Sequence, residues 1–193
     1  MNIERLNDLI RVMEGVRDAG RAFDIGAWAQ LDAKPAREMT LCNTACCAAG
    51  WCGFDPKFIE NGFAMRATVQ FDNCDKPSQD INISTKAGWM EMLEACRDPD
   101  YDGDVMIAPY YAEQGGFGAT EQYFDLTELQ NSYLFDGAFY RGGASYERCT
   151  PDDVIDHVQR VLDGRWIDDP HVQRNLPDSD DPRDFEDFDN DSE

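Results

Sequence analysis

The sequence predicts an α+β fold that is mostly helical, with a single domain over residues 1–167, a small antiparallel hairpin and a flexible acidic tail over residues 168–193. Three observations lead to this prediction. Apolar residues recur at helical spacing near both ends of the domain, apolar and polar residues alternate over one stretch in its middle, and the composition becomes acidic and rich in proline after residue 167. A domain of this length can bury a substantial core.

Helices are predicted at the two ends of the domain. The first opens the chain, and the last begins after Thr150, has Pro151 in its first turn and ends at Gly164. Their apolar faces consist of Ile3, Leu6, Ile10, Met13 and Val16 in the first helix and of Val154, Ile155, Val158, Val161 and Leu162 in the last. Three further helices are expected after Asn43 or Thr44, after Ser84 or Thr85, and after Thr127.

Strands are predicted in the middle of the domain. Apolar and polar residues alternate from Met65 to Phe71, and Ile81 with Ile83 indicates a second strand beyond a turn, so the two strands form an antiparallel hairpin. A short third strand is expected at residues 105–108. The glycine-rich residues 114–118 are expected to form an irregular loop, and they lack the lysine of a phosphate-binding loop.

Charge is the most informative feature for function. The chain has 39 acidic and 17 basic residues and a net charge of -22, of which the tail carries -9 and the domain -13. Such a chain repels nucleic acid and anionic membranes, whereas a basic protein surface attracts it. We therefore expect a basic host or phage protein as partner and no direct binding to nucleic acid or membranes. The alternative is that the charge only keeps the protein in solution, and the sequence leaves the oligomeric state open.

The tail carries two phenylalanines among its carboxylates. The candidate partner-binding residues are Asp184, Phe185, Glu186, Asp187, Phe188 and Asp189. Because the tail has few apolar side chains and three prolines, we expect it to become ordered only on a basic, partly apolar groove. The alternative is a tail that contacts only water.

The cysteine content and the first residues indicate a compartment. The seven cysteines are an odd number, no apolar run is long enough for a membrane span, and the first residues lack the basic and apolar regions of a signal peptide. We expect a cytoplasmic protein with reduced thiols, located in the host cytosol if a phage encodes it.

Four cysteines lie close together in the sequence, at Cys42, Cys46, Cys47 and Cys52. They could pack as small apolar residues, gather around zinc, or include a nucleophilic thiol at the start of a helix. Zinc sites usually draw paired ligands from two segments, and no base is evident near these cysteines, so packing is the favoured interpretation.

A second candidate metal site is acidic and consists of Asp98, Asp100, Asp102 and Asp104. This segment matches the opening of an EF-hand calcium loop, but Pro109 stands where the loop requires its last glutamate. A solvated acidic turn is the favoured alternative.

The two histidines are weak catalytic candidates. His157 lies beside the apolar face of the last predicted helix, so we expect a partly buried histidine there, with a partnership to Cys149 or Asp153 as the alternative. His171 lies near the start of the tail and indicates no role. No set of catalytic residues is evident, and an enzyme is the less favoured class.

Five short segments point to one group of proteins. They are Phe23–Trp28, Cys42–Trp51, Tyr123–Thr127, Leu134–Phe135 and Thr150–Val154. Together they resemble a group of uncharacterised phage and bacterial proteins that share a pattern close to Cys-Gly-Thr-Ala-Ala-Cys-Ala-Ala-Gly, although Asn43 replaces the glycine of this pattern. The resemblance covers about residues 20–165. It implies a small, mostly helical, phage-related protein and no particular activity.

Two hypotheses of function follow. The first is an interaction protein whose acidic surface binds a basic cleft, and which inhibits or modulates a host nucleic-acid-binding enzyme by charge mimicry. The second is a metal-binding protein, for calcium or zinc, or a thiol enzyme, which uses the Asp98–Asp104 loop or the Cys42–Cys52 cluster. Metal content after mild purification would separate the two.

Overall fold

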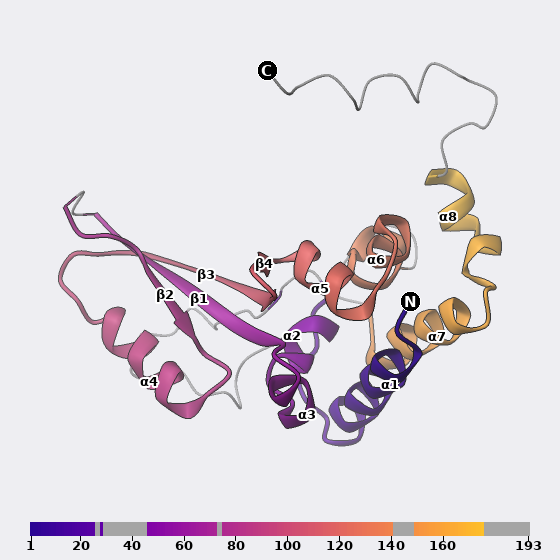
Figure 1. The fold of residues 1–193 in the computed structure, drawn as a ribbon, viewed down its shortest axis with the longest axis horizontal. Helices are drawn as coiled ribbons and strands as arrows, with labels where there is room; N and C mark the ends of the chain where they lie inside the picture. Colours follow the sequence, from indigo (N-terminus) through magenta and orange to yellow (C-terminus); the bar gives the residue numbers. More distant parts are fainter. Residues whose placement is uncertain (26–27, 29–45, 73–74, 141–148, 176–193) are drawn as a thin grey trace, which may run out of the picture.

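The computed structural model describes residues 1–25, 28, 46–72, 75–140 and 149–175. A helical part and a sheet part lie next to each other along the long axis of the molecule (Figure 1). The predicted fold class is confirmed, because helices dominate and the strands form one small antiparallel sheet. Among the described residues, no helix combines the length and the apolar composition that a membrane span requires.

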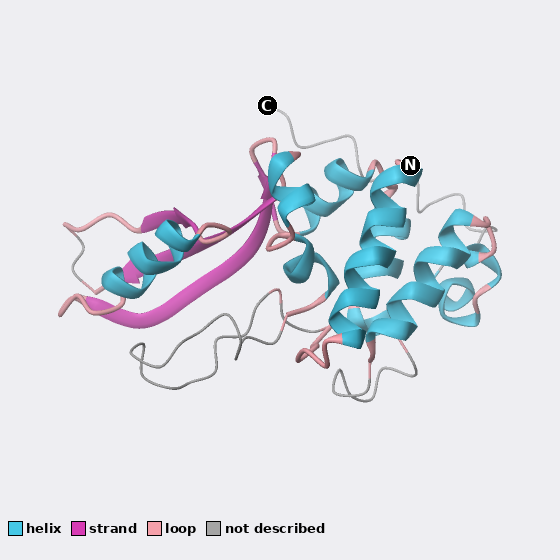
Figure 2. Cartoon of the chain, turned by 90° about the horizontal axis from the view of Figure 1, so that it is seen from below, coloured by secondary structure: helices cyan, strands magenta, loops and turns pink. Residues whose placement is uncertain are grey.

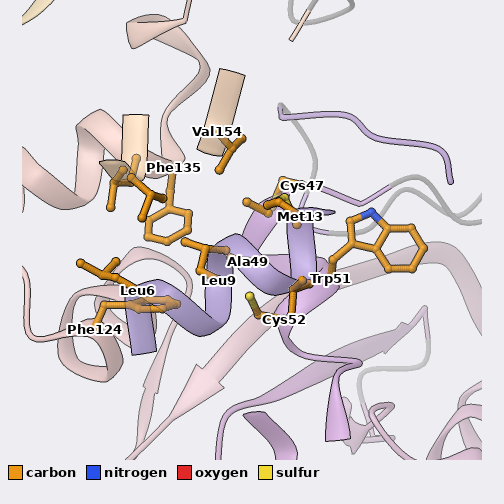
Figure 3. Close-up of a cluster of buried hydrophobic side chains, with 14 of the residues drawn as sticks. Leu6, Leu9, Met13, Cys47, Ala49, Trp51, Cys52, Phe124, Phe135 and Val154 are labelled. Atoms are coloured by element: carbon orange, nitrogen blue, oxygen red, sulfur yellow. The ribbon is translucent and has the colours of Figure 1, made fainter. Parts of the chain in front are cut away.

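The helical part is built around α1 (Ile3–Asp18), which packs against α2 (Ala48–Cys52) and α7 (Pro151–Leu162). The other elements of this part are α3 (Pro56–Glu60), α5 (Phe117–Phe124), α6 (Glu128–Phe135) and the 3-10 turn η3 (Gly137–Phe139). Leu6 and Leu9 of α1 are fully buried and point into the core that these helices share (Figure 3).

Side chains cap the helices where the sequence predicts it. Thr150 and Asp153 each accept a hydrogen bond from the other's backbone N–H at the start of α7. Thr127 and Gln130 form the same reciprocal pair at the start of α6. These bonds satisfy N–H groups that have no partner inside the helix, so they fix the residue at which each helix begins.

The sheet part has four antiparallel strands in the order β2-β1-β3-β4. The strands are β1 (Ala64–Phe71), β2 (Gln79–Asn82), β3 (Tyr101–Tyr111) and β4 (Gln114–Gly115). The helix α4 (Lys86–Ala95) lies along one face, where it buries the alternate side chains of β1 (Figure 2). The predicted β1–β2 hairpin is confirmed.

Two segments differ from the prediction. β3 is longer than the expected strand at 105–108, because it pairs with β1 from Tyr101 to Tyr110. The glycine-rich residues 114–118 are not an irregular loop, since they contain β4 and the start of α5. Gly116 has a φ of 60°, which lets the chain turn from strand to helix within one residue.

Folded structure continues beyond the predicted boundary at residue 167. The 3-10 turn η6 (Trp166–Asp168) leads into α8 (Pro170–Asn175), and both Asp169 and Val172 are buried. The described helical structure therefore extends past residue 167. The acidic composition of this segment gave no sign that Asp169 and Val172 are buried. The remaining tail, including Asp184, Phe185, Glu186, Asp187, Phe188 and Asp189, lies outside the described residues.

Candidate functional site

Three of the four clustered cysteines lie in the core of the helical part, and Cys42 lies outside the described residues. Cys46, Cys47 and Cys52 are at most 1 % exposed. The Sγ of Cys47 accepts a hydrogen bond from the backbone N–H of Gly50 at 3.4 Å and so caps α2. Figure 3 shows Cys47 and Cys52 among apolar side chains of the core. These three cysteines pack as small apolar residues, which is the interpretation favoured from the sequence.

Burial also changes the acidity of these thiols. It raises the pKa of Cys46 and Cys52 above the ordinary thiol value and raises that of Cys47 to about 12. A nucleophilic thiolate is therefore not favoured at these positions. The helix α2 begins later than the helix expected after Asn43 or Thr44, two residues that the structure does not describe.

The four aspartates of the predicted calcium loop do not share one loop. Asp98 and Asp100 lie in the turn between α4 and β3, whereas Asp102 and Asp104 belong to β3. The register between β1 and β3 shifts at this point, so Asp102–Asp104 forms an irregular bulge in the strand. An EF-hand loop winds around its ion, whereas the backbone of a strand is extended. The strand that begins at Tyr101 does not favour an EF-hand loop in this segment, and calcium binding at Asp98–Asp104 stays a prediction.

Lys76 contacts the described part of this acidic segment. Its ammonium forms a salt bridge with Asp98, lies 4.0 Å from Asp100, and sits over the ring of Phe71 at 4.4 Å. The hydrogen bond from Lys76 lowers the pKa of Asp98. In the part of the chain that the structure describes, no three His, Cys, Asp or Glu side chains are grouped so that they could hold a metal ion.

His157 is held between two tyrosine rings in the helical part. The ring centroids of Tyr133 and Tyr140 lie 4.3 and 4.1 Å from that of the imidazole, and the ring planes are within 2° and 11° of parallel. Nδ1 donates a hydrogen bond to the backbone carbonyl of Tyr133 at 3.1 Å. Burial lowers the pKa of His157. The buried helix histidine expected from the sequence is confirmed, and its burial favours the neutral imidazole.

The same cluster contains a buried carboxylate that the sequence analysis missed. Asp169 accepts hydrogen bonds from the Tyr133 hydroxyl at 3.1 Å and from the Arg160 guanidinium at 3.3 Å. Burial and the charge of Asp169 raise the pKa of Tyr133. Asp169 lies between η6 and α8, so these bonds attach the end of the described chain to α6 and α7. The preceding residue, Asp168, is also an aspartate but is exposed. No pattern in the sequence distinguishes the buried aspartate from the exposed one.

A surface pocket of about 250 Å³ lies beside the second half of α1. One wall holds Arg11, which donates to both carboxylate oxygens of Asp55 at 2.8 and 3.0 Å. Arg21 lies over the ring of Trp51 at 5.1 Å and has no carboxylate partner among the described residues. Because Asp55 neutralises Arg11, the guanidinium of Arg21 is the remaining positive group of the described pocket. A single exposed guanidinium in water binds an anion only weakly.

Most basic side chains of the described residues are neutralised by carboxylates. The cations in such pairs are Arg11, Arg17, Lys57, Arg66, Lys76, Arg97, Arg160 and Arg165. In the helical part several pairs join separate elements, such as Arg17 with Asp152 at 2.8 Å and Lys57 with Asp8 at 2.7 Å. On the part of the chain that the structure describes, little positive charge is left to attract an anionic ligand or nucleic acid.

The carboxylate excess is large in the sheet part. Residues 72–104 contain nine acidic residues and three basic ones. Two of the three basic residues, Lys76 and Arg97, are themselves paired with acidic neighbours. Asp72, Asp80 and Glu91 are exposed. The sheet part, which lies beside the helical part in Figure 1, therefore carries an excess of carboxylates on its surface.

Comparison with known proteins adds no assignment. The chain matches no protein family, no curated protein and no solved structure. The charged surface and the described side chains are therefore the basis on which a function can be argued.

Proposed function

We propose that this protein binds a basic surface on another protein, such as the nucleic-acid cleft of a host enzyme, and modulates that protein by charge mimicry. The observation that carries the proposal is the pairing of basic side chains described above. Because Arg11, Arg17, Lys57 and most of the other described cations are paired with carboxylates, negative charge dominates the field of the described surface, in a chain whose net charge is -22.

The proposed partner is a protein with a basic cleft, and its competitor there is nucleic acid. DNA presents about one negative charge per 1.7 Å of helix axis, so a cleft that binds it is lined with lysine and arginine. An acidic folded surface can occupy the same cleft without base contacts. The proposed location is the cytosol, which agrees with the free thiols of Cys46, Cys47, Cys52 and Cys96.

Salt dependence tests the proposal. The full-length protein is used to capture partners from nuclease-treated bacterial lysate at about 50 mM salt, and each captured protein is then purified. We expect the Kd of a true partner to rise steeply between about 50 and 200 mM salt, and we expect excess double-stranded DNA to displace it. Partners that bind equally well at both salt concentrations, and that DNA does not displace, would contradict the proposal.

The tail allows charge and aromatic contacts to be separated. Deletion after Pro177 removes nine acidic residues and one basic residue and leaves a net charge of -14. We expect this deletion to slow association without lowering the stability of the folded part. The matched variant Phe185→Ser with Phe188→Ser keeps every charge, and we expect it to leave association unchanged and to speed dissociation. Equal association rates for the deletion and the full chain would show that the tail does not contribute to the field.

A further inference from the structure

Among the described residues, one edge of the sheet is unpaired over part of its length. β3 pairs with β1 on one side, but on the other side β4 reaches only Tyr110 and Tyr111. Between the bulge at 102–104 and Pro109, no described residue pairs with the outer edge of β3. The free segment is Val105–Ala108, and it lies on the side of the sheet away from β2 (Figure 1).

The backbone groups on this edge can be assigned from the neighbouring hydrogen bonds. The carbonyl of Met65 accepts from Ile83 at 2.9 Å and thus faces β2, and the carbonyl of its partner Pro109 accepts from Gly116 at 2.9 Å and thus faces away from β1. Facing directions alternate along an antiparallel strand. The N–H and C=O groups of Val105 and Ile107 therefore point outward, away from β1.

The side chains of this edge do not carry the usual protection against pairing. Proteins commonly block exposed edges with lysine, proline or a cover. The segment Val-Met-Ile-Ala contains no proline or charge, Val105 and Ile107 are half-buried, and Met106 is 53 % exposed. An added strand would find outward backbone groups and an apolar side chain here.

Charge selects what can pair with this edge. The segment directly before it carries Asp98, Asp100, Asp102 and Asp104. Lys76 forms a salt bridge with the first of these, Asp98. A second copy of this chain would carry the same net charge of -22, so two copies repel each other over their whole surfaces. An extended segment rich in lysine or arginine would instead be attracted.

We propose that the outer edge of β3 at Val105–Ala108 binds an extended, basic segment of a partner protein by strand addition. The inference rests on the proposed function, because it specifies how the basic partner is held. The main-chain hydrogen bonds to Val105 and Ile107 would supply a sequence-tolerant contact, while the aspartates at the start of β3 would select for positive charge.

The test uses the full-length protein and a peptide of alternating lysine and valine at low salt. The control peptide has the same sequence with every backbone amide methylated, so it keeps its charge but cannot pair as a strand. We expect only the unmodified peptide to bind tightly, and we expect it to slow hydrogen exchange at the amides of Val105 and Ile107.

Two variants address the same edge from the protein side. Ile107→Pro removes an outward N–H that β1 does not use, and we expect it to weaken peptide binding about tenfold or more. Ile107→Val keeps the N–H, and binding should stay within about twofold of the unaltered chain. If Ile107→Pro does not fold, Val105→Pro and the exchange measurement on the unaltered chain still decide the question.

Each remaining outcome has a distinct meaning. Equal binding of both peptides, without slower exchange at Val105 and Ile107, would overturn strand addition and leave the basic-partner function standing. Failure of both peptides to bind at low salt would overturn the basic-partner function and this inference together. A dimer of the chain that protects the same two amides without peptide would assign the edge to a second copy and overturn the inference.

Discussion

The core of the helical part contains a cluster of contacting aromatic rings among its aliphatic side chains, whereas the core beneath the sheet is small and mostly aliphatic. In the helical part the rings of Phe58, Phe63, Tyr123 and Phe124 contact one another, with centroid separations between 4.8 and 6.2 Å. The buried residues of the sheet core are Met65, Ala67, Val69, Ile81, Ile83, Trp89, Met92 and Leu93. The two cores meet at Trp28 and Phe54, which pack against both.

The surfaces differ in the same way as the cores. Ion pairs such as Arg17 with Asp152 join elements of the helical part, while the sheet part has a carboxylate excess and a strand edge at Val105–Ala108 that no described residue pairs with. Parts of a protein that bind partners are often those with fewer buried contacts. The comparison indicates that the helical part provides more of the stability, and the sheet part is the contact surface in the proposed function.

The largest expected effect is in the aromatic core. Phe58→Ala removes a fully buried ring that contacts Phe63, Tyr123 and Phe124, and we expect it to lower the free energy of unfolding by about 3–5 kcal/mol. The measurement is urea denaturation followed by circular dichroism. Phe117→Ala is the matched control, because this ring is 43 % exposed and should cost clearly less. Equal costs for the two variants would contradict the central role of the aromatic core.

A smaller effect is expected where α4 approaches β2. A Cβ added to Gly88 would overlap the backbone carbonyl oxygen of Asn82, so α4 must move away from the sheet. We expect Gly88→Ala to destabilise the protein by about 1–3 kcal/mol, with faster hydrogen exchange in the sheet part and little change in α1 and α7.

The control for this prediction is a glycine with open space around it. Gly15 lies within α1, and no atom would come within 4 Å of an added Cβ. Gly15→Ala should therefore stabilise the protein, by about 0.5–1 kcal/mol. If Gly88→Ala speeds exchange equally in α1 and in the sheet, the two parts open as one unit and the comparison between them fails.

The sequence allowed prediction of those elements whose signal is local. Thr150 with Pro151, Thr127, and the alternation from Met65 to Phe71 each place an element correctly, because caps and periodicity act within a few residues. The length of β3 could not be predicted, since its first half is acidic and forms a strand through pairing with β1.

Candidate site residues were harder to predict, because burial depends on contacts distant in sequence. Asp169 is buried against Tyr133 and Arg160, and Tyr133 lies 36 residues away in the sequence. The neighbouring Asp168 is the same residue type but is exposed. The Asp98–Asp104 pattern fits a calcium loop only when sequence spacing is considered, and the strand from Tyr101 does not favour that geometry. The unpaired edge of β3 follows from strand order, which no local pattern specifies.

The smallest expected effect concerns pH and the histidine of the helical part. Burial holds the pKa of His157 below its ordinary value of 6.5, although the carbonyl of Tyr133 and the charges of Asp169 and Asp156 oppose this shift, while Arg160 adds to it. The unfolded chain therefore binds a proton near pH 6 more readily than the folded protein does. Stability should decrease as the pH falls through 6.5, and the decrease should end once the pH lies below the folded pKa.

His157→Phe isolates this contribution. The phenyl ring can still stack between Tyr133 and Tyr140 but does not titrate, so the variant should lose less stability than the unaltered chain when the pH falls from about 7.5 to 5.5. Urea denaturation at the two pH values measures the difference. The carboxylates whose pKa is lowered, such as Asp55 and Asp98, titrate below this window in both proteins, so they cancel in the comparison. An equal pH dependence in the two proteins would mean that His157 is protonated as easily in the folded state as in the unfolded one, and that the helical part tolerates a charge between its two tyrosine rings.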